Sequence, residues 1–284
     1  MSRLFVAMQY LLPRLWLTAL IYRLARIRSP AVKDWLIRRF IGLYDVDVDE
    51  VKREVPAGFA TFNEFFVREL EDGARPVDPD TAAVVSPADG TVSSAGPIHG
   101  NRIFQAKGHD YTLEDLLATD LQEARRFVDG AYATIYLAPY NYHRVHAPFG
   151  GRITAGRYLP GDLFSVNNAT VSHVPGLFRR NERLALHFDS ERGPWVLVLV
   201  GALNVGSIST PWSGEVRPRR HGVVEMIDTG NGPQTVDKGD LLGWFNMGST
   251  VILLTPKDMC EWNERLQPGA TVRMGQVIGS LQGE

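Results

Sequence analysis

A glycine–serine junction near the C-terminus could carry out chemistry on its own chain. Gly248 and Ser249 interrupt an apolar run that extends from Trp244 to Leu254. A serine hydroxyl next to the smallest residue can attack the preceding carbonyl and turn that amide into an ester. Elimination would then cut the chain and leave dehydroalanine, which hydrolyses to a pyruvoyl group. This electrophilic ketone can condense with a substrate amine and accept the electrons of a carbanion.

The tripeptide Gly-Ser-Thr alone is also typical of a turn or a bulge in a sheet, so the chemistry needs support from other residues. Asp89 lies in the stretch Ser86–Val92, where Asp-Gly is equally a hairpin signal. His143 and His146 follow a predicted strand. A neutral imidazole can take a hydroxyl proton near its pKa of about 6.5, and a carboxylate can fix its tautomer.

The histidine pair has two other interpretations. His-x-x-His can bind a metal, but no Cys cluster or Glu-x-x-His sequence accompanies it, so we expect no metal site. A purely structural pair also remains open. One Asp, two His and one Ser are nevertheless the groups that self-cleavage and a later proton transfer would need.

Composition limits the class of protein. The chain has 284 residues, of which 44% are hydrophobic, so it can form one large domain or two with a substantial core. Its net charge of −2 argues against a general nucleic-acid binder. The single Cys260 excludes an intramolecular disulfide framework and suits a reducing compartment.

Residues 1–44 are predicted to form amphipathic helices that associate with a membrane. Residues 1–40 contain eight basic side chains and one acidic side chain, and helical spacing is clear over Leu15–Ile27 and Ala31–Ile41. No signal-peptide cleavage site follows, and a spanning helix would bury Arg14. We therefore expect a peripheral anchor in the membrane surface. The alternative is a helical cap packed on the protein's own core.

Residues 45–284 are predicted to form a β-rich catalytic domain. Thr61 and Glu64 have the spacing of a capping box at a helix start. The phenylalanines Phe62, Phe65 and Phe66 would lie on one face of this helix, either as core or, less favoured, in contact with lipid. Leu113–Phe127 is the one clear helix expected further along. Short strands are expected at Val84–Val85, Thr91–Val92, Ala133–Leu137, Val196–Val200, Val223–Ile227 and Val251–Leu254.

Two late segments echo each other, which indicates related hairpins. Lys238–Gly243 and Met274–Gly279 both consist of a residue, Gly, a polar residue, two aliphatic residues and Gly. Similar turns occur in barrel-sandwich-hybrid folds, although two unrelated β-turns would give the same pattern. The predicted fold class is α+β, with a β-rich, barrel-sandwich-hybrid-like core and N-terminal amphipathic helices.

Several spaced motifs, in the same order, resemble the phosphatidylserine decarboxylase family, in its bacterial pyruvoyl-dependent form. The resemblance covers roughly residues 61–279. Its matching stretches are Thr61–Pro76, Ser86–Val92, Tyr142–Pro148, Gly161–Asn167, Asn181–Arg183, Val200–Gly206 and Lys238–Val251. The family's Leu-Gly-Ser-Thr cleavage sequence stands here as Met247-Gly248-Ser249-Thr250, a change that preserves volume and apolarity.

The resemblance implies a role for each matching residue. Ser249 would become the pyruvoyl cofactor, after cleavage between Gly248 and Ser249 into a β chain (1–248) and an α chain (249–284). Asp89 and His146 would form the self-processing triad with Ser249. His143 would donate a proton after CO2 leaves, and Ser165 would line the substrate site.

The implied activity is conversion of phosphatidylserine to phosphatidylethanolamine and CO2 in phospholipid biosynthesis, with no pyridoxal phosphate. The implied location is the cytoplasmic side of the cell membrane, with the α and β chains associated and a homodimer left open. The alternatives are a Ser-His-Asp hydrolase, a non-enzymatic β-hybrid binding module, or a decarboxylase for another serine-headed lipid. Arg179–Arg180 and Arg217–Arg220 are either phosphate-binding loops or solvated faces, and the latter is favoured.

Overall fold

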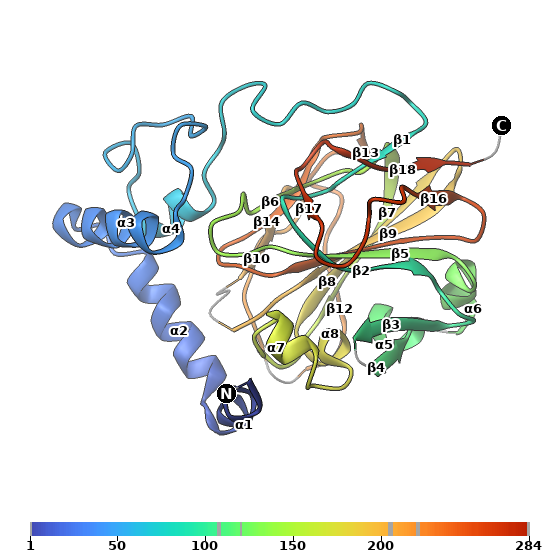
Figure 1. Ribbon diagram of the computed structural model, residues 1–284, viewed down its shortest axis with the longest axis horizontal. Helices are drawn as coiled ribbons and strands as arrows, with labels where there is room; N and C mark the ends of the chain where they lie inside the picture. The colour runs from blue at the N-terminus through green and yellow to red at the C-terminus, as the bar shows by residue number, and fades with distance from the viewer. Residues whose placement is uncertain (1, 107–108, 120, 204–206, 220–221, 283–284) are drawn as a thin grey trace.

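An arm of N-terminal helices lies along one side of a body made mostly of β-sheet (Figure 1). The computed structural model describes residues 2–106, 109–119, 121–203, 207–219 and 222–282. Within these ranges the helices are α1 (Ser2–Leu11), α2 (Arg14–Ala25), α3 (Pro30–Tyr44), α4 (Phe62–Phe66), α5 (Leu113–Leu117), α6 (Leu121–Ala124), α7 (Asn168–Val171), α8 (Leu177–Arg180) and the 3₁₀ helix Arg125–Phe127.

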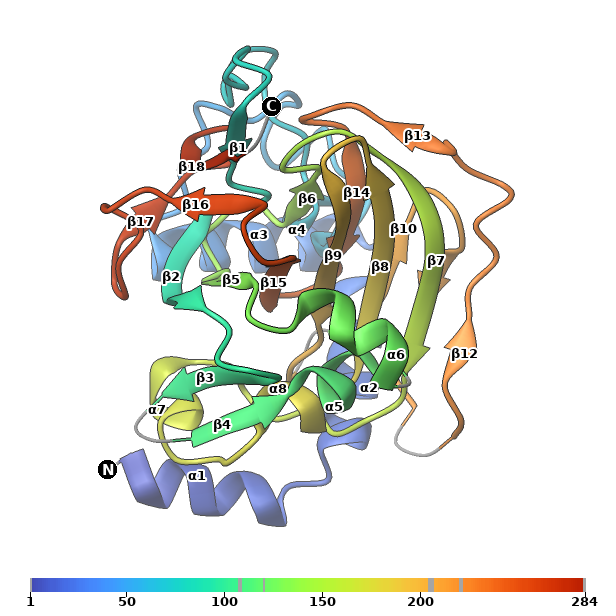
Figure 2. The same ribbon diagram turned by 90° about the vertical axis from the view of Figure 1, so that its right-hand side faces the viewer.

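The described strands form one large antiparallel sheet and three smaller ones. The large sheet has the order β12-β7-β8-β9-β15-β5-β2-β17, with β13 also paired to β7. Its strands are β2 (Gly90–Pro97), β5 (Ala131–Tyr136), β7 (Gly151–Leu159), β8 (Arg183–Ser190), β9 (Gly193–Val200), β12 (Glu225–Met226), β13 (Thr235–Val236), β15 (Thr250–Thr255) and β17 (Thr271–Val272). Figure 2 shows β7, β8 and β9 side by side, with β12 and β13 outside them.

The three smaller sheets complete the body. They have the orders β1-β18-β16, β11-β10-β14-β6 and β3-β4. Their strands are β1 (Ala83–Val85), β3 (Arg102–Ala106), β4 (His109–Thr112), β6 (Arg144–His146), β10 (Ile208–Thr210), β11 (Gly214–Val216), β14 (Leu241–Phe245), β16 (Cys260–Trp262) and β18 (Val277–Leu281). The predicted α+β, β-rich class is confirmed, and the described sheets are open rather than closed into a barrel.

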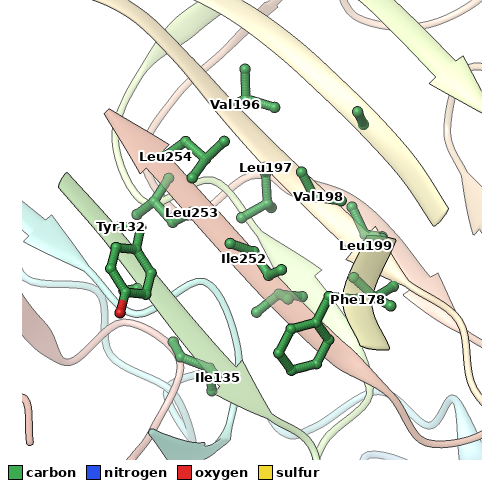
Figure 3. Close-up of a cluster of buried hydrophobic side chains, with 14 of the residues drawn as sticks. Tyr132, Ile135, Phe178, Val196, Leu197, Val198, Leu199, Ile252, Leu253 and Leu254 are labelled. Carbon is green, nitrogen blue, oxygen red and sulfur yellow. The ribbon is translucent and has the colours of Figure 1, made fainter. Parts of the chain in front are cut away.

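Strand β15 occupies the middle of the large sheet. It pairs antiparallel with β5 on one side and with β9 on the other, and all six of its residues are buried. The run Val251–Leu254 therefore has core on both faces, as its continuous apolar sequence predicts. Figure 3 shows Ile252, Leu253 and Leu254 among side chains from both neighbouring strands.

The N-terminal arm is divided by two prolines. Pro13 separates α1 from α2, and Pro30 begins α3, where its missing N–H costs no helical hydrogen bond. The two predicted helices at 15–27 and 31–41 are confirmed within one to three residues. Among the described residues, no helix is both long enough and apolar enough to cross a membrane.

Helix α4 begins as its sequence predicts. The Thr61 hydroxyl accepts a hydrogen bond from the Glu64 amide at 3.1 Å, and the Glu64 carboxylate accepts one from the Ala60 amide at 3.0 Å. The three phenylalanines are buried, so the prediction of core packing is confirmed. With Phe40 of α3 and Phe59, they form what we call the phenylalanine cluster, against which Met247 packs.

Three other predictions have different outcomes. The echoing segments are equivalent turns: Gly239 and Gly275 have φ of +91° and +84°, and each approaches the segment Pro76–Val77. The continuous helix predicted at Leu113–Phe127 is wrong. Ala118 takes the left-handed conformation, with φ of 45° and ψ of 49°, and ends α5 after one turn. The strand predicted at Val223–Ile227 is also shorter, since only β12 forms there.

Candidate active site

The Gly248–Ser249 junction lies in an irregular link between two strands. β14 ends at Phe245 and β15 begins at Thr250, so the predicted interruption of the apolar run is confirmed. The Ser249 side chain is completely buried, and its hydroxyl has no hydrogen-bond partner among the described residues. A buried hydroxyl without a partner costs about 1–3 kcal/mol. Such a hydroxyl in the link between two strands is a candidate for chemistry rather than for packing.

His143 is the histidine closest to the junction. Its Nδ1 lies 2.8 Å from the Asn141 carbonyl oxygen. A carbonyl can only accept, so Nδ1 carries the hydrogen and Nε2 presents a lone pair. Nε2 is buried without a partner in the described chain, 3.3 Å from the position that a Cβ on Gly248 would occupy. Burial, aided by the charge of Arg68, lowers the pKa of His143 to about 3, so the ring is neutral.

His146 lies on β6, and its lone pair is already occupied. Nδ1 donates to the Gly239 carbonyl at 2.8 Å, which leaves Nε2 to accept from the Tyr142 hydroxyl at 3.2 Å. Burial lowers the pKa of His146, against the raising effects of its bond to Gly239 and of the Asp89 charge. His146 is therefore also neutral, but only His143 has a free Nε2 among the described contacts.

Asp89 lies in the predicted turn, just before β2. Arg75 donates to both of its carboxylate oxygens at 2.7–3.0 Å, and the Met274 amide adds a bond at 2.8 Å. The described hydrogen bonds of Asp89 thus go to Arg75 and Met274 rather than to His146. The turn and β6 are nevertheless neighbours, because the His146 amide donates to the Pro87 carbonyl at 2.8 Å.

Ser165 is connected to the N-terminal arm. Its backbone amide donates to Gln9 Oε1 of α1 at 2.8 Å, and the Gln9 amide nitrogen reaches Thr170 Oγ1 at 3.0 Å. Arg14 holds the same loop through Asp162 at 2.9 Å. The described hydrogen bonds of Ser165 therefore connect it to helix α1 and, through its hydroxyl, to the Asn167 amide at 3.5 Å, and not to the Ser249 junction.

Asn246 is a site residue that the sequence did not reveal. Its Nδ2 donates to Ser207 Oγ at 2.7 Å and to Ser209 Oγ at 3.0 Å, and its carbonyl accepts from Asn63 Nδ2 at 2.8 Å. These bonds anchor the link two residues before the junction. Asn63 lies in the stretch Thr61–Pro76, whose conspicuous motif could have directed attention to it.

Two arginines of the same stretch were also overlooked. Arg75 is the partner of Asp89 and also donates to Glu50 at 2.8 Å. Arg68 is buried, and its positive charge helps to lower the pKa of His143. Long cationic side chains are usually solvated, so their sequence gave no signal that these two point inward.

Comparisons with known proteins agree on one family. A family model described as phosphatidylserine decarboxylase matches residues 62–280, and a second model, described as PSD, matches residues 4–45. Three curated relatives carry the name phosphatidylserine decarboxylase proenzyme. The protein from Pseudomonas fluorescens is 47% identical over 98% of this chain and 97% of its own length. That from Alcanivorax borkumensis is 45% identical over 100% and 98%, and that from Saccharophagus degradans 44% identical over 98% of both chains.

Proposed function

The chain belongs to the phosphatidylserine decarboxylase family and is an enzyme that decarboxylates phosphatidylserine, and from that premise we propose that it is made as a proenzyme that cuts itself between Gly248 and Ser249. One observation carries the proposal. The Ser249 hydroxyl is buried, without a described partner, in a break between two strands and beside a neutral histidine. The proenzyme names of the relatives agree with self-processing.

The cleavage would use atoms of the chain alone, plus one water. Ser249 Oγ loses its proton to a histidine and attacks the Gly248 carbonyl carbon, which moves the acyl group from nitrogen to oxygen. A base then removes the Ser249 Cα proton, and the Gly248 carboxylate leaves. The dehydroalanine formed at residue 249 tautomerises to an imine, which water hydrolyses to a pyruvoyl group and ammonia.

We assign the proton transfer to His146, oriented with the help of Asp89. This requires His146 Nε2 to exchange its Tyr142 partner for the Ser249 hydroxyl. A second assignment, in which His143 takes that proton, is favoured by the free Nε2 of His143 and its position beside Gly248. Variants of the two histidines distinguish these assignments.

The pyruvoyl group, when formed, supplies a ketone that captures the substrate amine and accepts the electron pair that CO2 leaves behind. Our assignment for His143 is then delivery of a proton to the substrate carbon. Its low pKa in the uncut chain comes first from burial. An anionic substrate beside the ring would raise that pKa and so favour the protonated form. Ser165 stays a proposed substrate-site residue, and its amide contacts Gln9 of the N-terminal arm.

We propose that the arm binds the cytoplasmic surface of the cell membrane, where the enzyme would serve phospholipid biosynthesis. Trp16, Leu20 and Trp35 are 82%, 53% and 63% exposed. A groove of about 1120 Å³ lies between α2 and Glu215–Arg219, and the side chains that line it are mostly apolar. Membrane phospholipid is the occupant that fits such a face, because the arm also carries exposed basic side chains that can attract anionic headgroups. Four of these side chains have no described hydrogen-bond or ion-pair partner: Arg23, Arg28, Arg38 and Arg39.

Vesicle flotation tests the membrane assignment. Trp16→Ser together with Leu20→Ser should weaken binding to phosphatidylglycerol-containing vesicles by about tenfold or more, since each side chain loses apolar burial. Met226→Ser is the matched control, because Met226 is 62% exposed on β12 rather than on the arm. Equal binding by all three proteins would contradict the assignment.

The two chains would remain together as one β-rich domain at residues 45–284, following the helices of 1–44. The boundary is supported by the end of α3 at Tyr44, where Asp45 takes a left-handed conformation. The α chain (249–284) would begin inside the sheet, with β15 hydrogen-bonded to β5 and β9 of the β chain. A homodimer remains a prediction.

Intact-mass spectrometry of the purified protein tests the proposal. We expect two chains that separate at Gly248/Ser249, with a pyruvoyl group at the start of the shorter chain, and no cut in Ser249→Ala. Thr134→Val is the matched control, because the Thr134 hydroxyl is also buried and lies on β5, beside β15 but outside the cleavage sequence. It should leave cleavage intact. A single uncut chain with Ser249-dependent hydrolytic activity would instead favour the hydrolase.

A further inference from the structure

Two arginines are equally buried but differ in their hydrogen bonds. Arg68 and Arg183 are both 4% exposed, and burial lowers the pKa of each to about 10, so both are charged at neutral pH. Arg183 donates to four backbone carbonyls at 2.5–2.9 Å. Arg68 donates to one, that of Tyr140, at 3.0 Å, and its guanidinium carbon lies 5.4 Å from the centre of the Phe65 ring. Its Nε and Nη1 are buried with no partner in the described chain.

A buried guanidinium with two nitrogen atoms that lack hydrogen-bond partners is costly, because the lost hydration of those atoms is not replaced. The planar fork of Nε and Nη1 matches two oxygens of a carboxylate or a phosphate. In the uncut chain the described residues supply no such oxygens to these atoms. Arg68 therefore has the properties of a binding group whose partner arrives later.

Arg68 lies in the same corner of the molecule as His143. Arg68 Nη2 and His143 Nδ1 bind the carbonyls of consecutive residues, Tyr140 and Asn141. The Phe66 ring is centred 4.2 Å from the His143 ring, and Arg144 Nε donates to the Val67 carbonyl at 3.0 Å. The segment 66–68 thus runs beside 143–144. This places Arg68 in the corner that also holds His143, whose Nε2 lies beside Gly248.

The substrate carries two anions, and the reaction treats them differently. The carboxylate loses its charge as CO2 forms, so an arginine that held it would stabilise the ground state more than the transition state. The phosphodiester keeps its charge throughout the reaction. An arginine bound to it therefore stabilises the ground state and the transition state equally and does not slow decarboxylation. We propose that Arg68 binds the phosphodiester of phosphatidylserine and so positions the headgroup beside His143 and residue 249.

The other candidate arginines already have partners. Arg179 lies 3.8 Å from Asp115 and Arg180 lies 3.6 Å from Asp162, while Arg219 pairs with Glu225. Arg217 is exposed and lies over the Tyr22 ring at 4.4 Å, so its charge remains hydrated. Arg220, the last residue of the second arginine loop, lies outside the described residues. Arg68 is thus the better candidate for the phosphate, although it is more deeply buried than any of the four described arginines.

The inference rests on the proposed function, because Arg68 is enclosed in the uncut chain. Met247 packs against the phenylalanine cluster that contains Phe65 and Phe66, close to Arg68 in sequence. A cut after Gly248 turns Met247–Gly248 into a chain end. Withdrawal of that end would give a headgroup access to the Arg68 corner.

Binding of glycerophosphoethanolamine provides the test, because this probe carries the phosphodiester and no carboxylate. Isothermal titration of the cleaved enzyme should show binding that weakens about tenfold to a hundredfold in Arg68→Gln, the range expected for charge-assisted hydrogen bonds. Arg180→Gln, the matched control, should bind like the wild type. The uncut Ser249→Ala protein should bind at least tenfold more weakly than the cleaved wild type. N-acetyl-L-serine, with a carboxylate and no phosphate, should show no dependence on Arg68.

Turnover of phosphatidylserine gives a second readout. Arg68→Gln should raise KM by a similar factor and leave kcat within about threefold. Arg68→Lys should show an intermediate KM, and it carries the test if the Gln variant does not fold. Mass spectra separate the two failures: an uncut wild type overturns the proposed function. Normal cleavage with unchanged probe binding in Arg68→Gln, or Arg68-dependent binding of N-acetyl-L-serine alone, overturns the assignment of Arg68.

Discussion

The Arg183 guanidinium at the start of β8 and the polar side chains of the Gly248–Ser249 junction are all buried, yet they differ in how their hydrogen bonds are satisfied. At the start of β8, Arg183 donates to four carbonyls from two segments of chain, residues 115–116 and 179–181. At the junction, four side chains have buried polar atoms with no partner among the described residues: Ser249, Thr250, His143 and Arg68. In the first region polar groups hold the fold together. In the second the fold keeps polar groups available, at a cost in stability.

The difference separates structural from functional burial. An isolated unpaired atom occurs in many folded proteins, and Trp195 Nε1 is one here. The neighbouring side chains at the junction include hydroxyls, an imidazole and a guanidinium, which together form a set of reacting and binding groups. Their shared location beside a break in an apolar strand, more than any single residue, distinguishes the junction from the rest of the core.

Histidine variants should have the largest effect. If His146 is the base, His146→Ala should slow self-cleavage by about 10²–10⁴-fold, the usual contribution of a general base. His143→Ala should still cut and then lose decarboxylase activity. Mass spectra taken over time measure the cut, and CO2 release measures the activity. The reverse pattern would show that His143, whose Nε2 is free, and not His146, whose Nε2 is occupied by Tyr142, initiates self-cleavage.

The two arginines should differ in stability, which tests the comparison directly. Arg183→Met leaves four buried carbonyls unpaired and should lower the free energy of unfolding by about 3–5 kcal/mol. Arg68→Met removes an unpaired buried charge and should change it by less than about 1 kcal/mol, or raise it. Both are measured by urea unfolding in the uncut Ser249→Ala background. Similar losses in the two variants would remove the distinction between the regions.

Acid should reveal the burial of His143. The unfolded ring binds a proton below its ordinary pKa of 6.5, whereas the folded ring does so only near 3. The unfolded state thus binds more protons between these values, so stability falls as the pH drops below 6.5. Between pH 7 and 5 the uncut Ser249→Ala protein should lose about 2 kcal/mol more than the same protein with His143→Gln. Equal losses in the two proteins would mean that the folded ring titrates normally.

The smallest effect should come from the link that precedes the junction, where Asn63 holds the Asn246 carbonyl. Asn63→Ala removes one bond to the Asn246 carbonyl and should lower the free energy of unfolding by about 1 kcal/mol. Cleavage should slow severalfold, because the link before Gly248 becomes less fixed. Asn101→Ala, which removes only a partly buried contact to Glu114, is the control. Unchanged cleavage in Asn63→Ala would show that the link needs no anchor.

The sequence predicted most of the fold because much of its pattern is local. The apolar run of β15, the cap at Thr61 and the prolines of the arm each act through neighbouring residues. The helix predicted at 113–127 failed at Ala118, where a left-handed residue gives no signal in its own identity. The order of strands in the large sheet depends on pairings between distant segments, which periodicity does not encode.

The candidate site could be named from the sequence as a set of residues but not as a set of contacts. Asp89, His143, His146 and Ser249 could be named because their types suit the chemistry. Their hydrogen bonds depend on tertiary structure: Asp89 meets Arg75, and His146 meets Tyr142. The arginines were missed for a related reason, since exposure is the usual state of such side chains and their burial depends on the assembled sheet.

The central position of β15 has a consequence for how this protein can be made. Before the proposed cut, the sheet forms from one chain, and β15 reaches its place between β5 and β9 by closing a loop. Afterwards the same six-residue strand belongs to a separate polypeptide, and the sheet could reassemble only by a second-order encounter of two molecules. Only the intact precursor can therefore form this sheet within a single chain. We expect cleaved enzyme, once denatured and diluted, to recover poorly compared with the uncut Ser249→Ala protein, so that turnover of the enzyme in the cell would require new synthesis rather than repair.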